Sequence, residues 1–246
     1  RNITPMHPSK KILFAFLLVS VAAFSSCPVW ANSTPSSLPA VPPQQSAAAI
    51  PLEIENQDAL RVEVQEISGD VSAAKGAILH SGDTIKTGKG SCRLLIDGKA
   101  KVLLTPHTNL KISEAIRDTQ AKTDSTVLML DSGNLKIELP KLKKGSRFEV
   151  NTPTAIATVR GTIFYIQTGT TQGQASTKLY VDESKGGVGF KNLFSGQSLI
   201  VPAFSLSNAL ANGNLDKPVQ LTDEQKEAFF EAWKQFFGSS GASQQF

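Results

Sequence analysis

The feature that most constrains the fold is a long series of short apolar runs, separated by turn signals, between residues 57 and 204. Several runs alternate apolar and polar residues, which is the period of a strand with one buried face. Asp97-Gly98 supplies the positive φ angles of a two-residue turn and predicts a hairpin that joins 94–96 to 99–104. A second hairpin is predicted within residues 178–191. The series therefore predicts an all-β domain over residues 57–204.

A weak internal repeat runs through the same region. The form Leu-x-Ser-Gly-polar occurs at residues 79–83, 130–134 and 193–197, with spacings of 51 and 63 residues. Because the spacings differ, the repeat does not indicate a solenoid with one fixed period. It fits similar strand–turn–strand units whose apolar faces bury one another. Both a β-sandwich and a β-roll that resembles a β-helix satisfy this pattern.

The N-terminal residues have the pattern of a secretory signal peptide. Lysines precede an apolar run at residues 12–19, and small-type residues stand at the −3 and −1 positions of a cleavage site that ends at Ala31. The apolar run is too short for a transmembrane span. We expect translation to begin at Met6 and cleavage to remove residues 1–31. The mature protein is then periplasmic or secreted, in a Gram-negative cell envelope.

Cys27 leaves a second processing route open. A lipoprotein signal also ends at a cysteine, which is acylated and anchors the protein to a membrane. Phe24 stands three residues earlier, where Leu is usual, and this favours ordinary cleavage. Cys92 then remains as a single cysteine, so no internal disulfide is expected. It lies in a strand-like run and is predicted to be a small buried side chain.

Charge gives no sign of a nucleic-acid partner. Removal of residues 1–31 takes three of the 25 basic residues and none of the 21 acidic ones, so the mature chain is near neutral. Nucleic-acid binding needs a basic face that neutralises phosphates. One basic cluster is predicted to be a solvated loop, with anionic polysaccharide or lipid headgroups as the alternative contact. Its members are Lys136, Lys141, Lys143, Lys144 and Arg147.

The segments on either side of the β domain have a different composition. Residues 32–56 are rich in Pro, Ser, Ala and Gln and are predicted to be a disordered linker. Within 205–246 we expect a loop, then a helix over 222–237 that begins with a capping box of Thr222 and Gln225, then a disordered end. The helix carries an aromatic stripe that either packs on the β domain or docks on a partner. The stripe consists of Phe229, Phe230, Trp233, Phe236 and Phe237.

No group of residues predicts catalysis or a cofactor. His80 and His107 lie in turns, without the spacing to Cys or carboxylates that a metal site requires. The closeness of His80, Ser81 and Asp83 does not indicate a triad, because triads are assembled by the fold. The Gly-rich run at 87–91 departs from a phosphate loop and precedes no helix, so a tight turn is predicted. We therefore expect a protein that is not an enzyme and binds no metal.

Two segments carry a family resemblance. Residues 81–91 read SGDTIKTGKGS, and residues 150–164 read VNTPTAIATVRGTIF. In this order, inside one β-like stretch, they resemble the two signatures of the FecR-type domain, a bacterial cell-envelope module, over residues 60–204. The resemblance implies an all-β, β-helix-like roll. The signature positions, for which structural roles are expected, are Gly82, Asp83, Thr87, Ser91, Thr152, Pro153, Arg160, Gly161, Thr162 and Phe164.

Arg160 has two open roles. If it shares one strand face with Thr158 and Thr162, it is half-buried and its guanidinium is satisfied by carbonyl or carboxylate oxygens. The alternative is direct contact with a partner. The family pattern often has an acidic residue after Thr162, where this chain has Ile163, which is expected to face outward. The candidate partner contacts are Arg160, Ile163, Phe229, Trp233 and Phe236.

The resemblance also bears on function. The best-known FecR-type proteins pass a signal from an outer-membrane transporter to a cytoplasmic sigma factor, but here the segment before the apolar run is too short for a sigma-binding domain. We expect an exported, non-catalytic binding module whose partner is an envelope protein or a cell-wall polysaccharide. The alternatives are a structural lipoprotein anchored through Cys27 and, on location alone, an enzyme acting on envelope glycans.

Overall fold

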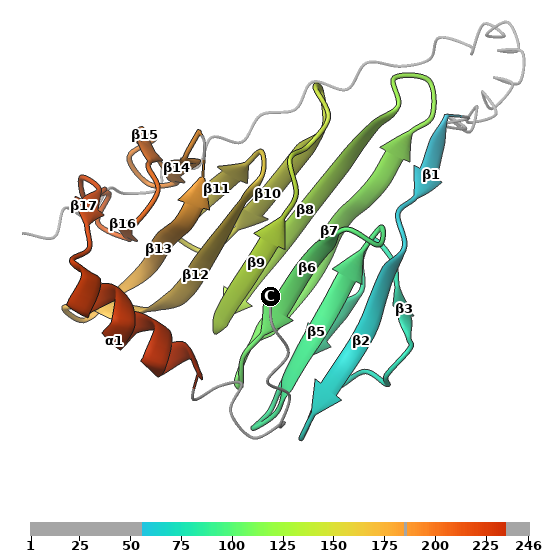
Figure 1. Ribbon diagram of the computed structural model, residues 1–246, viewed down its shortest axis with the longest axis horizontal. Helices are drawn as coiled ribbons and strands as arrows, with labels where there is room; N and C mark the ends of the chain where they lie inside the picture. Colours follow the sequence, from blue (N-terminus) through green and yellow to red (C-terminus); the bar gives the residue numbers. More distant parts are fainter. Residues whose placement is uncertain (1–55, 185, 235–246) are drawn as a thin grey trace, which may run out of the picture. The chain divides into compact units, whose positions relative to one another are not determined.

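A computed structural model describes residues 56–184 and 186–234 (Figure 1). The predictions for residues 1–31, including Cys27, and for residues 32–55 lie outside this part of the chain. The predictions for Phe236 and for the C-terminal end also lie outside the described residues. The structure does not describe the Trp233 side chain.

The described residues form two β-sheets and one helix, α1 (Asp223–Lys234). The first sheet contains β1 (Gln57–Ala59), β4 (Thr84–Lys86), β7 (Asn109–Asp118), β8 (Thr123–Ser132), β10 (Arg147–Asn151), β11 (Ala155–Val159), β14 (Val188–Asn192) and β15 (Ser198–Val201). The second contains β2 (Val62–Ser68), β3 (Ile78–Leu79), β5 (Ser91–Ile96), β6 (Ala100–Leu104), β9 (Asn134–Leu139), β12 (Thr162–Thr171), β13 (Gln174–Ser184), β16 (Ser205–Leu210) and β17 (Val219–Gln220).

Strand order shows that the chain passes repeatedly between the sheets. The first sheet runs β1-β7-β8-β10-β11-β14-β15, with β4 also paired to β7, and the second runs β17-β16-β13-β12-β9-β6-β5-β2-β3. β8 and β10 are parallel neighbours, because the chain visits β9 in the other sheet between them. The all-β prediction is confirmed.

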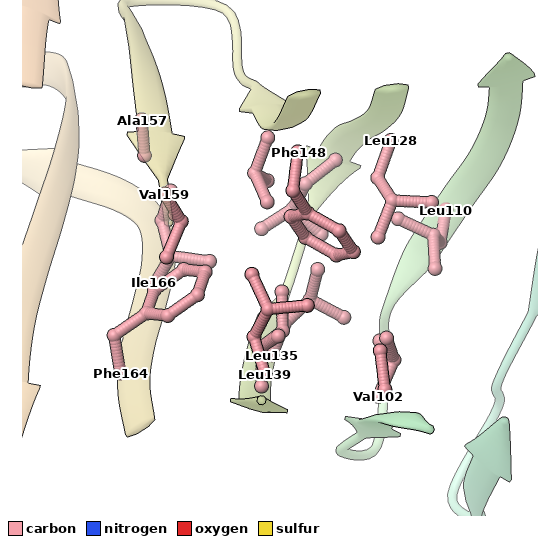
Figure 2. Packing of buried hydrophobic residues seen from close by; sticks show 14 of the residues in the cluster. Val102, Leu110, Leu128, Leu135, Leu139, Phe148, Ala157, Val159, Phe164 and Ile166 are labelled. Carbon is pink, nitrogen blue, oxygen red and sulfur yellow. The ribbon is translucent and has the colours of Figure 1, made fainter. Parts of the chain in front are cut away.

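One apolar core lies between the two sheets. In many strands alternate residues point inward, as in β5, where Cys92, Leu94 and Ile96 are buried. Figure 2 shows Leu128 of the first sheet and Leu135 of the second among the side chains that meet in this core. Burial of each large side chain contributes about 2 kcal/mol. Both sheets thus bury their inner faces against each other, as they would in either of the two architectures that the repeat allowed, the β-sandwich and the β-roll.

The first predicted hairpin is confirmed and the second is wrong. β5 and β6 pair around Asp97 (φ 49°) and Gly98 (φ 65°). In contrast, β13 pairs with β12 and β16 in the second sheet, whereas β14 pairs with β11 and β15 in the first. The turn signals after β13 therefore carry the chain from one sheet to the other. At Gly187 (φ 73°) the backbone passes so close to β15 that a Cβ would lie 2.7 Å from the Val201 carbonyl oxygen.

The loop expected at 206–219 contains two strands. β16 pairs with β13, and β17 pairs with β16, so the sheet continues beyond residue 204. The polar composition of β16 concealed it: Ser207 is buried, and its hydroxyl donates to the Asp216 carbonyl at 2.7 Å. The helix begins as predicted, because the Thr222 N–H donates to Gln225 Oε1 at 3.0 Å and the Gln225 N–H donates to Thr222 Oγ at 3.3 Å.

The prediction that Cys92 is buried is confirmed, since its side chain is 1% exposed. Burial raises the pKa of its thiol to about 12, so almost none is thiolate at neutral pH. In a Cys27→Ser chain we expect Cys92 to react with an aromatic disulfide reagent at least about a hundredfold more slowly in the native than in the denatured state. Equal rates, or a melting temperature that changes with reductant, would contradict this account.

Candidate functional site: a basic corner and an end pocket

The first signature segment engages its polar groups within the fold. The Asp83 carboxylate accepts a hydrogen bond from the His80 N–H at 2.7 Å and closes the turn before β4. The buried Thr87 hydroxyl donates to the Thr105 carbonyl at 2.6 Å and accepts from the Thr108 N–H at 2.8 Å. These side chains therefore hold turns and strand ends together.

The Gly-rich run of the same segment packs against another turn. A Cβ on Gly88 would lie 2.1 Å from the Asp70 carboxylate, and one on Gly90 would lie 2.2 Å from the Ser68 carbonyl oxygen. Ser91, which ends the run, begins β5 and pairs with Ser68. A carboxylate beside Gly88 repels phosphate, so this geometry agrees with a tight turn.

The second signature segment ties the two sheets together through buried hydroxyl groups. Thr152 and Thr154 lie on either side of exposed Pro153 in the turn between β10 and β11. Their Oγ atoms lie 2.7 and 2.6 Å from Oγ of Thr177, which belongs to β13 of the other sheet. The Thr152 hydroxyl also accepts from the Ala155 N–H at 2.9 Å. The turn is thereby fixed to the opposite sheet.

Arg160 is exposed, so the expectation of a half-buried guanidinium is wrong. In β11 the odd-numbered residues 155, 157 and 159 point into the core. In β12 the even-numbered residues 162, 164 and 166 point into it. The inward parity changes because β11 ends at Val159 and the chain crosses to the second sheet through Arg160 and Gly161. Counting alternation through this corner placed Arg160 on the inner face with Phe164.

The backbone around Arg160 is held tightly. Its carbonyl accepts a hydrogen bond from the Leu142 N–H at 2.9 Å. Gly161 has φ 138°, and a Cβ on it would lie 2.6 Å from Lys141 Cα. The Arg-Gly-Thr signature thus fastens the loop at 140–146, which connects β9 to β10, to the corner between β11 and β12.

This contact places Arg160 beside the predicted basic loop. Lys141, Lys143 and Lys144 are exposed, and like the Arg160 side chain they form no ion pair within the described residues. We call these four residues the basic corner. Two members of the predicted cluster have other roles: Lys136 pairs with Glu138 at 2.8 Å, and Arg147 pairs with Glu149 at 2.6 Å.

A pocket of about 230 Å³ opens beside the basic corner, and we call it the end pocket. The loop at 140–146 forms one wall, and the β5–β6 turn forms another. Its lining includes the apolar side chains of Leu60, Ile96, Ala100, Leu139, Leu142 and Phe148. Lys141 and Lys143 line it, whereas Lys144 and Arg160 do not.

Acidic residues at the pocket are neutralised by neighbouring cations. Asp97 accepts hydrogen bonds from Lys99 and from Arg117 Nη2, and Arg117 Nε donates to Asp124 at 2.7 Å. Burial alone would raise the pKa of Asp97, but the hydrogen bonds from Lys99 and Arg117 hold it below its ordinary value. Asp97 is therefore ionised near neutral pH, and both carboxylates are paired with Arg117, which leaves the charges of Lys141 and Lys143 uncompensated.

Helix α1 covers an aromatic face of the second sheet (Figure 1). Tyr165 and Tyr180 are buried there, with ring centroids 5.1 and 4.6 Å from that of Phe229. Ile163 points outward and joins this cluster, and so does Phe230. Of the two alternatives for the helix, packing on its own β domain is the one observed. The two tyrosines were not predicted, although Tyr165 shares the outward parity of Ile163.

The described residues contain no cluster of His, Cys, Asp and Glu side chains that would hold a metal ion. None of the helices in this part of the chain is long and apolar enough to cross a membrane.

Comparison with known proteins finds a family match over part of the chain. Residues 83–183 match the family described as FecR protein. A search of curated proteins finds no match. Two crystal structures, at 2.50 and 1.65 Å, of a protein provisionally described as an anti-sigma factor from Parabacteroides distasonis are similar, with 16% identity and a TM-score of 0.45. The similarity covers 60% of this chain and 64% of theirs, which is less than two thirds of their length.

Proposed function

Since residues 83–183 are a FecR-type domain, we propose that the protein is a non-catalytic binding module of the bacterial cell envelope. The signal-like residues 1–31 support export to the periplasm or beyond. Anchoring through an acylated Cys27 is the alternative route to the same compartment. The observation that carries the proposal is the exposed Arg160 on a rigid corner of the fold.

A preorganised cation suits recognition. Arg160 contributes no internal ion pair among the described residues, yet its backbone is fixed by the Leu142 N–H and by the close approach at Gly161. Because the backbone is already fixed, binding orders only the Arg160 side chain and costs little backbone entropy. The guanidinium presents a planar fork that fits carboxylates in a bidentate manner. We therefore propose that the partner presents carboxylates to the basic corner.

Two partners carry such groups, an acidic surface of an envelope protein and an anionic cell-wall polysaccharide. We favour the protein, because the four cations lie on two segments that a backbone hydrogen bond joins, and an acidic protein surface complements such a local group of positive charges. A binding role also agrees with the signature threonines, whose hydroxyl groups are occupied by hydrogen bonds within the fold.

We expect Arg160→Ala to change the free energy of unfolding by less than about 0.5 kcal/mol, because the side chain is exposed. The same variant should lose the partner when tagged protein is captured from envelope fractions and quantified by mass spectrometry. Lys178→Ala, which removes an exposed cation from β13, is the charge-matched control and should retain the partner. A large fall in melting temperature would indicate a structural role for Arg160, and unchanged capture would count against the proposal.

A further inference from the structure

We propose that the end pocket binds the apolar chain of a single-chain anionic amphiphile, whose head group pairs with Lys141 and Lys143. A free fatty acid and a lysophospholipid with an acidic head group both have this chemistry. The site goes beyond the proposed function, because it takes a small molecule and requires no protein partner.

The interior of the pocket is suited to a hydrocarbon chain. Leu60, Leu139 and Phe148 contribute apolar atoms at the open end of the core, and each is otherwise buried. The volume of about 230 Å³ lies below the range of about 300–1,000 Å³ that is usual for drug-sized ligands. The pocket therefore holds a short length of chain rather than a whole branched lipid.

The charges at the mouth select an anion. The acidic lining residues Asp97 and Asp124 are both paired with Arg117. Lys141 and Lys143 are exposed and have no partner among the described residues. An anionic head group at the mouth is attracted by both lysines, whereas a cationic head group is repelled by them.

The wall of the pocket is held at both ends. On one side, the Leu142 N–H bonds the Arg160 carbonyl. On the other, the Ser146 hydroxyl accepts from the Asp124 N–H at 3.0 Å. Leu142 itself packs against the core. The pocket is thus preformed, and a ligand does not have to order the loop when it binds.

Calorimetric titration of the full chain with decanoate, below its micelle concentration, tests this site. We expect saturable binding whose affinity rises about fourfold for each methylene from hexanoate upward and then levels off when the pocket is full. Decyltrimethylammonium should bind far more weakly than decanoate. No saturable binding of any of the acids, or equal affinity for the cationic amphiphile, would overturn the proposal.

Matched lysine variants locate the head group. Lys143→Gln should weaken decanoate binding about fivefold, and Lys144→Gln, which alters the neighbouring lysine outside the pocket, by less than about twofold. Equal effects of the two substitutions would contradict the placement of the head group beside Lys143. Ala100→Phe should fill the pocket and abolish binding, and the chain-length series on the unaltered protein decides the matter if that variant does not fold.

Two further measurements distinguish a membrane lipid from a free fatty acid as the ligand, and the amphiphile site from the partner contact at Arg160. If lysophosphatidylglycerol displaces decanoate and binds more tightly, a membrane lipid is the source; if decanoate alone binds, a free acid is. Arg160→Ala should leave decanoate binding unchanged, because Arg160 does not line the pocket. Loss of protein capture in that variant, with decanoate binding intact, would show that the pocket binds its ligand without the partner contact at Arg160.

Discussion

Replacing Gly161 with alanine is expected to lower the free energy of unfolding by about 3 kcal/mol or more. The backbone at Gly161 has φ 138°, which L side chains rarely adopt. A Cβ there would also lie 2.6 Å from Lys141 Cα and 3.0 Å from its backbone nitrogen. Because these are backbone atoms, no side-chain movement relieves the clash. Urea denaturation of the full chain, followed by circular dichroism, measures the loss.

Substitutions at two other glycines separate the two causes of this destabilisation, the unfavourable φ angle and the steric clash of the added Cβ. Gly196 has φ 72° with nothing within 4 Å of its Cβ position, so Gly196→Ala should cost about 1 kcal/mol. Gly169 lies in β12 in open space at an ordinary φ, and its replacement by alanine should be close to neutral. If Gly161→Ala is no worse than Gly196→Ala, the corner does not hold the loop at 140–146 as described.

Deletion of residues 222–246 is expected to reduce the free energy of unfolding by about 2–4 kcal/mol and to create binding of a hydrophobic dye. The helix buries Phe229 and Phe230 in part and covers Tyr165 and Tyr180. Burial of a large apolar side chain contributes about 2 kcal/mol, aromatic pairs add about 0.5–1.5 kcal/mol, and the entropy of ordering the helix offsets part of this. Thermal melting and dye fluorescence measure both effects.

Point substitutions show whether the aromatic contact is responsible. Phe229→Ala should reproduce a large part of the loss, because its ring lies against both tyrosines. Glu227→Ala alters an exposed residue of the same helix and should leave the melting temperature unchanged. An unchanged melt after the deletion, with no dye binding, would mean that α1 does not stabilise the domain.

Local patterns predicted the elements whose stabilising contacts are close in sequence. Alternation and the Asp97-Gly98 turn predicted the β5–β6 hairpin, and Thr222 with Gln225 predicted the start of α1. The signature segments predicted the family. In the hairpin and at the helix start, the interacting residues lie within one turn or one pair of adjacent strands, so that spacing alone contains the information.

Features that depend on the crossing between sheets were not predictable. The turn after β13 has the composition of a hairpin turn, yet it leads to the opposite sheet, and composition does not distinguish the two outcomes. Counting alternate residues from β11 through Gly161 into β12 predicted that Arg160 is half-buried, because the count does not register that the chain changes sheets there. The end pocket could not be inferred, because its lining comes from segments near residues 60, 96–100, 124–126 and 139–148, which only the tertiary fold brings together.

The claim that the basic corner contacts an envelope partner is tested most directly by a photo-reactive amino acid placed at position 160 in living cells. We predict a covalent adduct between the protein and an envelope component on irradiation. The same amino acid at position 178, on the exposed outer side of β13, should give none. Absence of an adduct at position 160, or the same adducts at both positions, would contradict the proposed function.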